Sequence, residues 1–234
     1  MDTHENLTLS IPSQAELEEI FKGKTPDEAR SMILSIRRLM SYYQCAILEI
    51  ETKFRVLNEE FSLQYDRNPI HNIHTRLKSG ASIRDKILRK NLPASVDAIE
   101  ENIEDIAGVR VVCSFVDDIY YLESALVKQD DITLLRRKVY VADPKPNGYR
   151  SLHLIVAVPI FLSSQKRIIK VEVQLRTIAM DSWASLEHQL RYKKDIEKTE
   201  EIEKTLFRCA ELSSELDSKM NRLRELIRSS TNTV

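Results

Sequence analysis

NGYRSLHL (residues 147–154) and KVEVQLRT (residues 170–177) decide the fold of this chain. In both stretches apolar residues occupy every second position, which is the period of a strand with one buried face. The positions between them carry polar side chains, namely Tyr149, Ser151, His153, Lys170, Glu172, Gln174 and Arg176. Polar side chains concentrated on one face of neighbouring strands predict a cleft for a charged ligand.

The composition limits the class of protein. A chain of 234 residues can bury a full core as one domain with helical additions. A net charge of -1 argues against general nucleic-acid or membrane-surface binding, so we expect neither DNA nor membrane as a partner. The three cysteines lack a Cys-x-x-Cys pattern, which indicates reduced thiols. Residues 1–5 lack signal-peptide features, and the longest apolar run, residues 154–162, is too short for a membrane span. We therefore expect a cytoplasmic protein.

Amphipathic helices are predicted on both sides of the middle of the chain. Thr25-Pro26-Asp27-Glu28 is a strong helix start, with a capping Thr and a Glu three residues later. Apolar residues then recur at helical spacing as far as Phe61, which predicts one long helix or two nearly continuous ones. A shorter helix is expected at residues 13–21, and another long one, with an apolar stripe, at residues 197–227.

The middle of the chain mixes strand and helix signals. Strands are predicted at residues 70–75, 109–116, 133–141, 151–159 and 168–175. Helices are predicted at residues 82–89, 96–106, 117–128 and 177–192. The fold class is therefore α/β or α+β, with flanking helices. We expect a helical region at residues 1–66, a mixed strand–helix domain at residues 67–194 and a C-terminal helix at residues 195–234.

The segment RLKSGASIRDK (residues 76–86) runs from a strand end through a glycine turn into a helix. Ser82 and Lys86 lie four apart on one helical face, while Arg76 and Lys78 share one side of an extended segment. Amide donors and cations at a helix N-terminus suit a polyphosphate. A solvated basic face is the alternative, and the spacing of a Walker A loop is absent.

The segment EDIAGVR (residues 104–110) places an acid beside a glycine. Asp105 is expected at the end of a helix, and Arg110 at the start of a buried strand. A carboxylate at a helix C-terminus is unfavourable with respect to the helix dipole, so a cation is expected opposite it. An Asp105–Arg110 structural ion pair and a ligand-binding acid both remain open.

Two further segments supply charge and an aromatic ring. Lys138, Lys145 and Arg150 add positive charge, Tyr149 offers a ring for base stacking, and His153 offers a donor to phosphate. Glu172 is the one acid on its predicted strand, and with Asp105 it could form a two-carboxylate Mg²⁺ site. Two acids, several cations and no nucleophile–base pair fit phosphoryl-type transfer better than acyl transfer.

Four motifs, in order between residues 70 and 193, resemble the synthetase domain of RelA/SpoT-type enzymes. They are Arg-x-Lys-Ser-x-x-Ser-Ile-x-x-Lys, Asp-Ile-Ala-Gly-Val-Arg, Gly-Tyr-Arg-Ser-Leu-His and Glu-Val-Gln-Leu-Arg-Thr. The short length is similar to that of the stand-alone small alarmone synthetases of the RelP/RelQ type. No His-Asp dipeptide occurs and no room remains for hydrolase or regulatory domains, so the resemblance implies synthesis without hydrolysis.

The resemblance implies Mg²⁺-dependent transfer of the β,γ-pyrophosphate of ATP to the ribose 3′-hydroxyl of GDP or GTP. The products would be ppGpp or pppGpp, plus AMP. The implied fold is a nucleotidyltransferase-like mixed five-stranded sheet flanked by helices. The resemblance also implies a homotetramer formed through the terminal helices.

The resemblance assigns roles by matching position. The residues it assigns to ATP are Arg76, Lys78, Ser82, Lys86 and Arg110, the two arginines enclosing adenine. Asp105 and Glu172 would bind Mg²⁺, and Glu172 would also take the 3′-hydroxyl proton. The residues assigned to GDP or GTP are Lys138, Lys145, Tyr149, His153, Gln174 and Asp181. Tyr149 would stack on guanine, and Asp181, where some relatives have Asn, would accept from the guanine N1 and N2 donors.

Two other functions stay open from the residues alone. One is a non-catalytic helical regulator that binds nucleotide or RNA. The other is an ordinary nucleotidyltransferase that releases pyrophosphate. Such transferases usually carry Asp-x-Asp or Asp-x-Glu on a strand, and the candidate strands contain no such pair.

Overall fold

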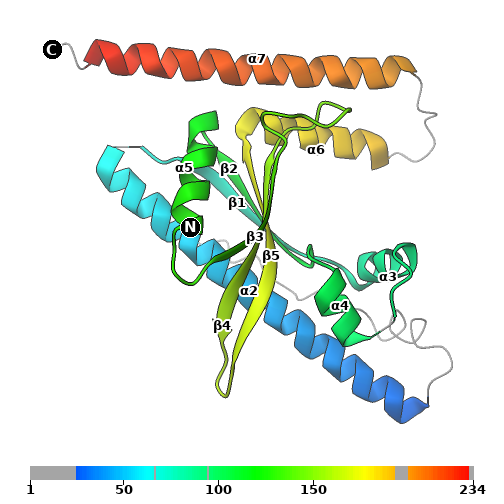
Figure 1. Ribbon diagram of the computed structural model, residues 1–234. Helices are drawn as coiled ribbons and strands as arrows, with labels where there is room; N and C mark the ends of the chain where they lie inside the picture. The colour runs from blue at the N-terminus through cyan, green and yellow to red at the C-terminus, as the bar shows by residue number, and fades with distance from the viewer. Residues whose placement is uncertain (1–24, 66, 94, 193–199, 232–234) are drawn as a thin grey trace, which may run out of the picture.

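The computed structural model describes residues 25–65, 67–93, 95–192 and 200–231 (Figure 1). The elements in chain order are α2 (Pro26–Tyr65), β1 (Ile70–Leu77), α3 (Gly80–Arg89), α4 (Val96–Asn102), β2 (Ala107–Cys113), α5 (Val116–Val127), β3 (Thr133–Val139), β4 (Leu152–Phe161), β5 (Lys166–Thr177), α6 (Ile178–Tyr192) and α7 (Glu200–Thr231). The helix predicted at residues 13–21 lies outside the described residues.

The predicted start of the long N-terminal helix is confirmed. The backbone N–H and the hydroxyl of Thr25 both donate to Glu28 Oε2, each at 2.9 Å, and Glu28 N–H donates back to Thr25 Oγ1 at 3.4 Å. This reciprocal cap satisfies backbone donors that have no partner within the helix. The helix that follows, α2, is one continuous element.

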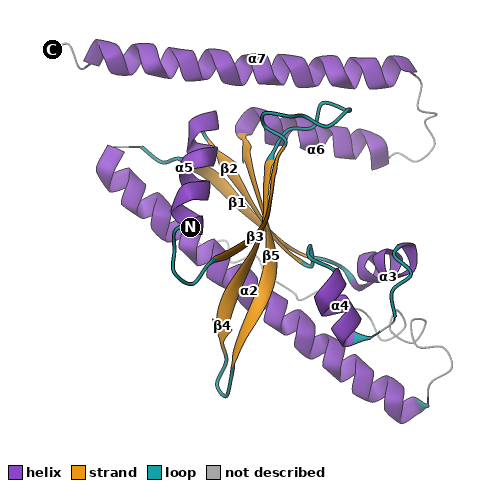
Figure 2. Ribbon diagram, viewed as in Figure 1, coloured by secondary structure: helices purple, strands orange, loops and turns teal. Residues whose placement is uncertain are grey.

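The five strands form one mixed sheet, as predicted (Figure 2). Their order is β1-β2-β5-β4-β3, and only the β2–β5 pair is parallel among these strands. The prediction of helix up to residue 106 was wrong, because α4 ends at Asn102. Residues 103–106 are not helical, and the carbonyl of Ile106 accepts from Lys78 N–H at 2.8 Å beside β1. Asp105 therefore lies in the short segment between α4 and β2, three residues beyond the last residue of α4.

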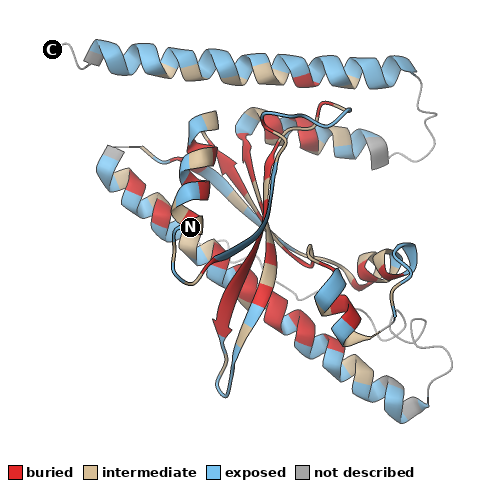
Figure 3. Cartoon of the chain, in the orientation of Figure 1, coloured by how far each residue is buried: buried red, intermediate tan, exposed pale blue. Residues whose placement is uncertain are grey.

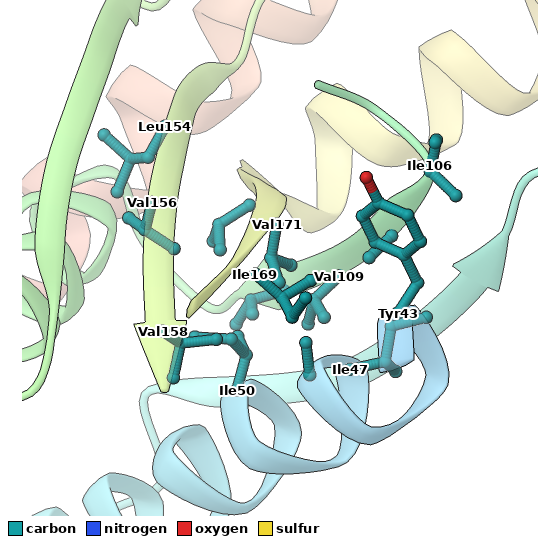
Figure 4. Packing of buried hydrophobic residues seen from close by; sticks show 14 of the residues in the cluster. Tyr43, Ile47, Ile50, Ile106, Val109, Leu154, Val156, Val158, Ile169 and Val171 are labelled. Carbon is teal, nitrogen blue, oxygen red and sulfur yellow. The ribbon is translucent and has the colours of Figure 1, made fainter. Parts of the chain in front are cut away.

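One face of the sheet is apolar and is covered by α2 and α5. The alternating residues of the three central strands that face these helices are buried, among them Val109, Leu154, Val156, Ile169 and Val171. Figure 4 shows Tyr43, Ile47 and Ile50 of α2 packed against this face. The burial of a continuous apolar surface fixes the register of each strand, since a slip of one residue would expose it.

Ile50→Val is expected to lower the free energy of unfolding by about 0.5–1.5 kcal/mol, because Ile50 is completely buried. Val56→Ala is the matched control on the same helix, since Val56 is 60 % exposed. Although it removes more atoms, it is expected to change stability by less than about 0.5 kcal/mol. Denaturant unfolding measures both, and equal losses would contradict this account of the core.

Whereas α2 packs against the sheet, helix α7 packs against another helix. It lies along α6, and most of its surface is exposed (Figure 3). The apolar stripe predicted for this helix faces away from the core of its own chain; its exposed members include Leu212, Leu216, Met220, Leu223 and Ile227. In the described part of the chain, no helix combines the length and apolar character required to span a membrane.

Candidate active site

The strand register aligns residues of the uncovered face of the sheet in two rows, and most of these residues are polar. One row contains, in sheet order, His74, Arg110, Gln174, His153 and Lys138. The adjacent row contains Arg76, Gly108, Glu172, Ile155 and Arg136. Residues that are distant in sequence thus become neighbours because side chains on one face of paired strands lie together.

Two adjoining cavities lie over these rows. The first, of about 340 Å³, is lined in part by Arg76, Lys78, Arg110 and Gln174. The second, of about 210 Å³, is lined in part by Lys86, Lys138 and His153. Asp105 and Glu172 line both cavities. The two acids predicted to act together therefore stand where a cation-lined cavity for one ligand meets a cation-lined cavity for another.

Asp105 is held by two lysines. Lys86 Nζ donates to Asp105 Oδ1 at 2.6 Å, and Lys78 Nζ donates to Oδ2 at 3.0 Å. Burial alone raises the pKa of Asp105, but the hydrogen bonds and charges of Lys86 and Lys78 outweigh burial and hold it below its ordinary value. Asp105 is therefore ionised at neutral pH. The alternative Asp105–Arg110 ion pair was wrong, since Arg110 pairs with Asp181 instead at 3.3 Å.

Glu172 belongs to a closed ring of five hydrogen-bonded side chains. Gln174 Nε2 donates to Glu172 Oε2 at 2.9 Å, and His153 Nδ1 lies 3.3 Å from Oε1. Arg176 Nη2 donates to Gln174 Oε1 at 2.9 Å and to the Tyr149 hydroxyl at 2.7 Å. The Tyr149 hydroxyl lies 2.8 Å from His153 Nε2, which closes the ring. The predicted stacking platform and the predicted catalytic acid are thus parts of one network.

When His153 is neutral, the ring of hydrogen bonds fits one of its two tautomers. Because the Tyr149 oxygen already accepts from Arg176, its own hydrogen is available to His153 Nε2. Nε2 then accepts, and the Nδ1 hydrogen points to Glu172. A neutral His153 in this arrangement has no N–H left for a phosphate, so its predicted role at the acceptor phosphates requires a second proton or the loss of the Tyr149 contact.

The pKa of Glu172 is also below its ordinary value. Burial raises it, but the hydrogen bond and charge of His153, with the hydrogen bond from Gln174, outweigh burial, while the charge of Asp105 opposes them. A carboxylate with a lowered pKa is a good ligand for a cation and a weak base. No cluster of three or more His, Cys, Asp or Glu suited to a metal occurs within the described residues. A cation held by Asp105 and Glu172 would therefore take further oxygens from a nucleotide or from water.

An aromatic and cationic group stands beside the second cavity. The Lys145 ammonium lies 4.7 Å from the ring centroids of both Tyr140 and Tyr149. The Arg176 guanidinium lies 5.0 Å from the Tyr149 centroid. Arg176 also pairs with Asp181 at 3.1 Å, so Asp181 is shared between Arg176 and Arg110. Tyr149 and Asp181 thus contact residues that line the two cavities, and Lys145 contacts Tyr149, but none of the three lines either cavity.

Several expectations for single residues need correction. Ser151 was expected on the polar face, but it is buried and its hydroxyl donates to Leu175 O at 3.1 Å. Arg150 was expected to add charge to the site, but it donates to Val141 O and to Ser214. Ser82 lies at the start of α3, where its N–H is capped by Ser79 Oγ at 3.3 Å, and it does not line the two cavities formed by the described residues.

Sequence reasoning missed two cations in the second cavity, Lys90 and Arg136. The sequence spacing of both residues relative to predicted site residues indicates that they lie in the site. Lys90 follows Lys86 by four residues, and Arg136 precedes Lys138 by two, so each continues the face of a predicted site residue. Arg136 forms an ion pair with Glu104 at 2.8 Å at the rim of this cavity.

Gly108 leaves space in the floor of the first cavity. It lies in β2 and is paired with Arg76 of β1 on one side and Glu172 of β5 on the other. A methyl group at this position would meet only Arg76 O, at 3.6 Å, and would otherwise project into open space among the described residues. The backbone can therefore approach a ligand closely here.

Comparisons with known proteins agree with this architecture. A model of the region found in RelA and SpoT proteins matches residues 75–197, more than half of the chain. GTP pyrophosphokinase YwaC of Bacillus subtilis (strain 168) is 39 % identical over 194 residues, which cover 83 % of this chain and 92 % of that protein. GTP pyrophosphokinase YjbM of the same strain is 36 % identical over 187 residues, 80 % of this chain and 87 % of that protein.

A solved structure, small alarmone synthetase 1 from Bacillus subtilis bound to its product pppGpp, has the same fold. It superimposes with a TM-score of 0.75 at 36 % identity, over 82 % of this chain and 97 % of that one. The match thus extends through the sheet that carries both rows of site residues. This chain belongs to the RelA/SpoT family.

Proposed function

We infer that this chain is a GTP pyrophosphokinase, which transfers the β,γ-pyrophosphate of ATP to the 3′-hydroxyl of GDP or GTP. The observation that carries the proposal is the position of Asp105 and Glu172 in the lining of both cation-lined cavities. Transfer between two nucleotides requires a donor and an acceptor to meet at one centre. The similarity to GTP pyrophosphokinases over most of the chain supports the same reaction.

In the proposed reaction the acceptor 3′-oxygen attacks the β-phosphorus of ATP. The bond from that phosphorus to the oxygen of the α-phosphate breaks, and AMP leaves with this oxygen. The 3′-hydroxyl proton passes to Glu172 or to water, and the guanosine nucleotide gains two phosphates. Because such transition states involve little covalent chemistry by the protein, positioning and charge neutralisation supply most of the catalysis.

The first cavity, lined by two arginines and a lysine, suits ATP, the pyrophosphate donor. Arg76 and Arg110 offer planar cations for adenine, and Lys78 offers an ammonium for phosphate. Lys78 and Lys86 share the single carboxylate of Asp105. ATP phosphates would compete for these ammonium groups, and the freed Asp105 would then be available to a cation.

We propose Mg²⁺ as that cation, held by Asp105 and Glu172. The fit rests on two ionised carboxylates, which supply the hard oxygen donors that Mg²⁺ prefers. Bound Mg²⁺ would neutralise charge on the transferring phosphates and position them. Glu172 would hold the 3′-hydroxyl by hydrogen bonding, and its lowered pKa makes it a weak acceptor for the proton.

We propose a homotetramer assembled through the terminal helices. The support is the stripe of apolar residues that α7 exposes, including Leu212, Leu216 and Met220. A stripe of this kind is typical of a surface that packs against another chain. We also propose a cytoplasmic enzyme, since its nucleotide substrates belong to that compartment and its three cysteines are unpaired.

The product assay tests the function. Purified protein with ATP, GDP and Mg²⁺ is expected to produce AMP and a guanosine tetraphosphate, separated by anion-exchange chromatography. With GTP as acceptor, a pentaphosphate replaces the tetraphosphate. Release of pyrophosphate without AMP would indicate an ordinary nucleotidyltransferase. Nucleotide binding with no turnover would indicate a regulator, and either outcome overturns the proposal.

Tyr149→Ala is expected to raise the KM for GDP by about 5- to 150-fold, since base stacking on an aromatic ring contributes about 1–3 kcal/mol. The KM for ATP is expected to stay within about twofold. Steady-state kinetics with each substrate varied in turn measures both constants. Phe161→Ala is the control, because Phe161 is 73 % exposed at the end of β4. An equal rise in both KM values for Tyr149→Ala would contradict a platform for the acceptor.

A further inference from the structure

Helix α7 turns a mostly polar stripe toward its own chain. Ala210, Ser214, Asp217 and Arg224 recur at steps of three, four or seven residues, which places them on one helical face. Each of them contacts another part of the chain, and the apolar stripe of the same helix is exposed. Helices usually bury their apolar face, so the inward polar stripe requires a reason other than core packing. We call Ala210, Ser214 and Asp217 the inner stripe.

The first contact of the inner stripe is with Gly148. This glycine has a φ of 86°, in the region that side chains rarely adopt, and it directly precedes Tyr149. A methyl group at residue 148 would lie 2.5 Å from Ala210 Cβ and 3.5 Å from Phe207 Cδ2. Ala210 is buried although most of α7 is exposed. The backbone of Gly148, next to Tyr149, thus packs directly against α7.

The second contact is through Arg150, on the other side of Tyr149. Its Nη1 donates to Ser214 Oγ, while Nε donates to Val141 O at 3.1 Å. Arg150 therefore ties the two ends of the loop of residues 141–150 to α7. Tyr149 lies between two residues that α7 holds.

The third contact reaches the other strand of the site. Thr177 is fully buried, and its hydroxyl donates to Asp217 Oδ2 at 2.7 Å. The same hydroxyl oxygen accepts from Met180 N–H at 3.1 Å and so caps α6, which carries Asp181. Thr177 directly follows Arg176, the donor to the Tyr149 hydroxyl. Asp217 thus fixes Thr177, the residue next to Arg176, and Arg176 in turn holds the hydroxyl end of the Tyr149 side chain.

These contacts converge on one side chain. We propose that the inner stripe of α7 positions Tyr149 for the acceptor nucleotide, with Asp217 and Ser214 as positioning residues that do not touch substrate. The inference rests on the proposed function, because it uses the guanine nucleotide as the ligand of Tyr149. Most residues that line the first cavity lie on β1 and β2 or in the segments beside them, and only Glu172 and Gln174 belong to β5, whose last residue, Thr177, bonds to Asp217.

The experiment is a comparison of Asp217→Ala and Ser214→Ala with controls on the same helix. Each variant is expected to raise the KM for GDP by about 2- to 12-fold, the range for loss of one hydrogen bond, with the KM for ATP unchanged within about twofold. Asp217→Asn keeps an acceptor for the Thr177 hydroxyl and is expected to restore most of the affinity for GDP. Glu215→Ala and Ser218→Ala are the controls, because both residues are exposed and, among the described residues, form their bonds within α7.

A double-mutant cycle separates positioning from general weakening. In a Tyr149→Ala background, Asp217→Ala is expected to have no further effect on kcat/KM for GDP, because both changes remove the same interaction. An undiminished effect in that background, an equal rise in the KM for ATP, or wild-type kinetics in Asp217→Ala would each overturn the proposal.

A binding measurement keeps the two proposals distinguishable. If the wild-type protein forms no AMP, the proposed reaction fails, but calorimetric binding of GDP still tests the inner stripe. Weaker GDP binding in Ser214→Ala and Asp217→Ala, with recovery in Asp217→Asn, would support positioning by α7. Binding equal to that of the wild type would reject it, and Ser214→Ala serves if Asp217→Ala does not fold.

Discussion

Replacing Glu172 with Gln is expected to lower kcat by about 10²- to 10⁴-fold, the range for loss of an acid–base or cation-holding group. Glu172 is the acid that both cavities share on the sheet itself, and its neighbours His153 and Gln174 stabilise its ionised form. Glutamine preserves the shape of the side chain but has no charge and no basic oxygen. The protein should therefore fold normally and bind nucleotides without transferring pyrophosphate.

The measurement is AMP formation at saturating ATP and GDP, alongside the thermal unfolding midpoint. Glu101→Gln is the control, since Glu101 is exposed on α4 outside both cavities. It is expected to retain activity within about twofold. Activity of Glu172→Gln near that of the control would remove Glu172 from the mechanism.

Asp105→Asn is expected to lower kcat by about 10²- to 10³-fold, the range for removal of one electrostatic stabiliser at a reacting centre. The change removes the negative charge that Lys78 and Lys86 share. An amide at this position can still accept one hydrogen bond, but it leaves two ammonium groups close together without a counter-charge. Asp97→Asn, at an exposed position in the first turn of α4, is the control for activity and stability.

The stability cost of Asp105→Asn should depend on pH. The folded pKa of Asp105 lies below its ordinary value of about 3.8, so ionised Asp105 stabilises the fold. This contribution is fully present above the ordinary pKa and is lost as the pH falls through the folded pKa. The difference in unfolding free energy between wild type and Asp105→Asn should therefore be constant near neutral pH and shrink below about pH 3.8. A difference that grows on acidification would contradict the lysine pairing.

The sheet could be predicted from the sequence because its two faces differ. Alternation in residues 166–177 marks which side chains are buried and which are polar, whereas residues 152–161 are apolar and buried at nearly every position. The long helices could be predicted as well, since Thr25 and Glu28 form the cap that their spacing indicates. The resemblance predicted that Asp105 and Glu172 lie close together. The parallel pairing of β2 with β5 explains this, because Gly108, three residues after Asp105, is paired with Glu172.

Other features depend on tertiary contacts that spacing does not encode. The apolar residues of 103–106 continue a helical pattern, but Ile103 and Ile106 are buried in an extended segment against the sheet. Ser151 follows the alternation of β4, yet β4 begins only at Leu152, so its hydroxyl turns to the Leu175 carbonyl. The partners of Arg110 and Arg150 come from α6 and α7, far along the chain, and no local pattern indicates them.

Binding of a single cation between the two acids is the most direct test of this account. Electron paramagnetic resonance of Mn²⁺, a substitute for Mg²⁺, can be recorded with the protein in excess over a non-hydrolysable ATP analogue. We expect one protein-bound Mn²⁺ per nucleotide in the wild type, and much weaker binding in both Asp105→Asn and Glu172→Gln. Wild-type Mn²⁺ binding in either variant would contradict a cation held jointly by these carboxylates.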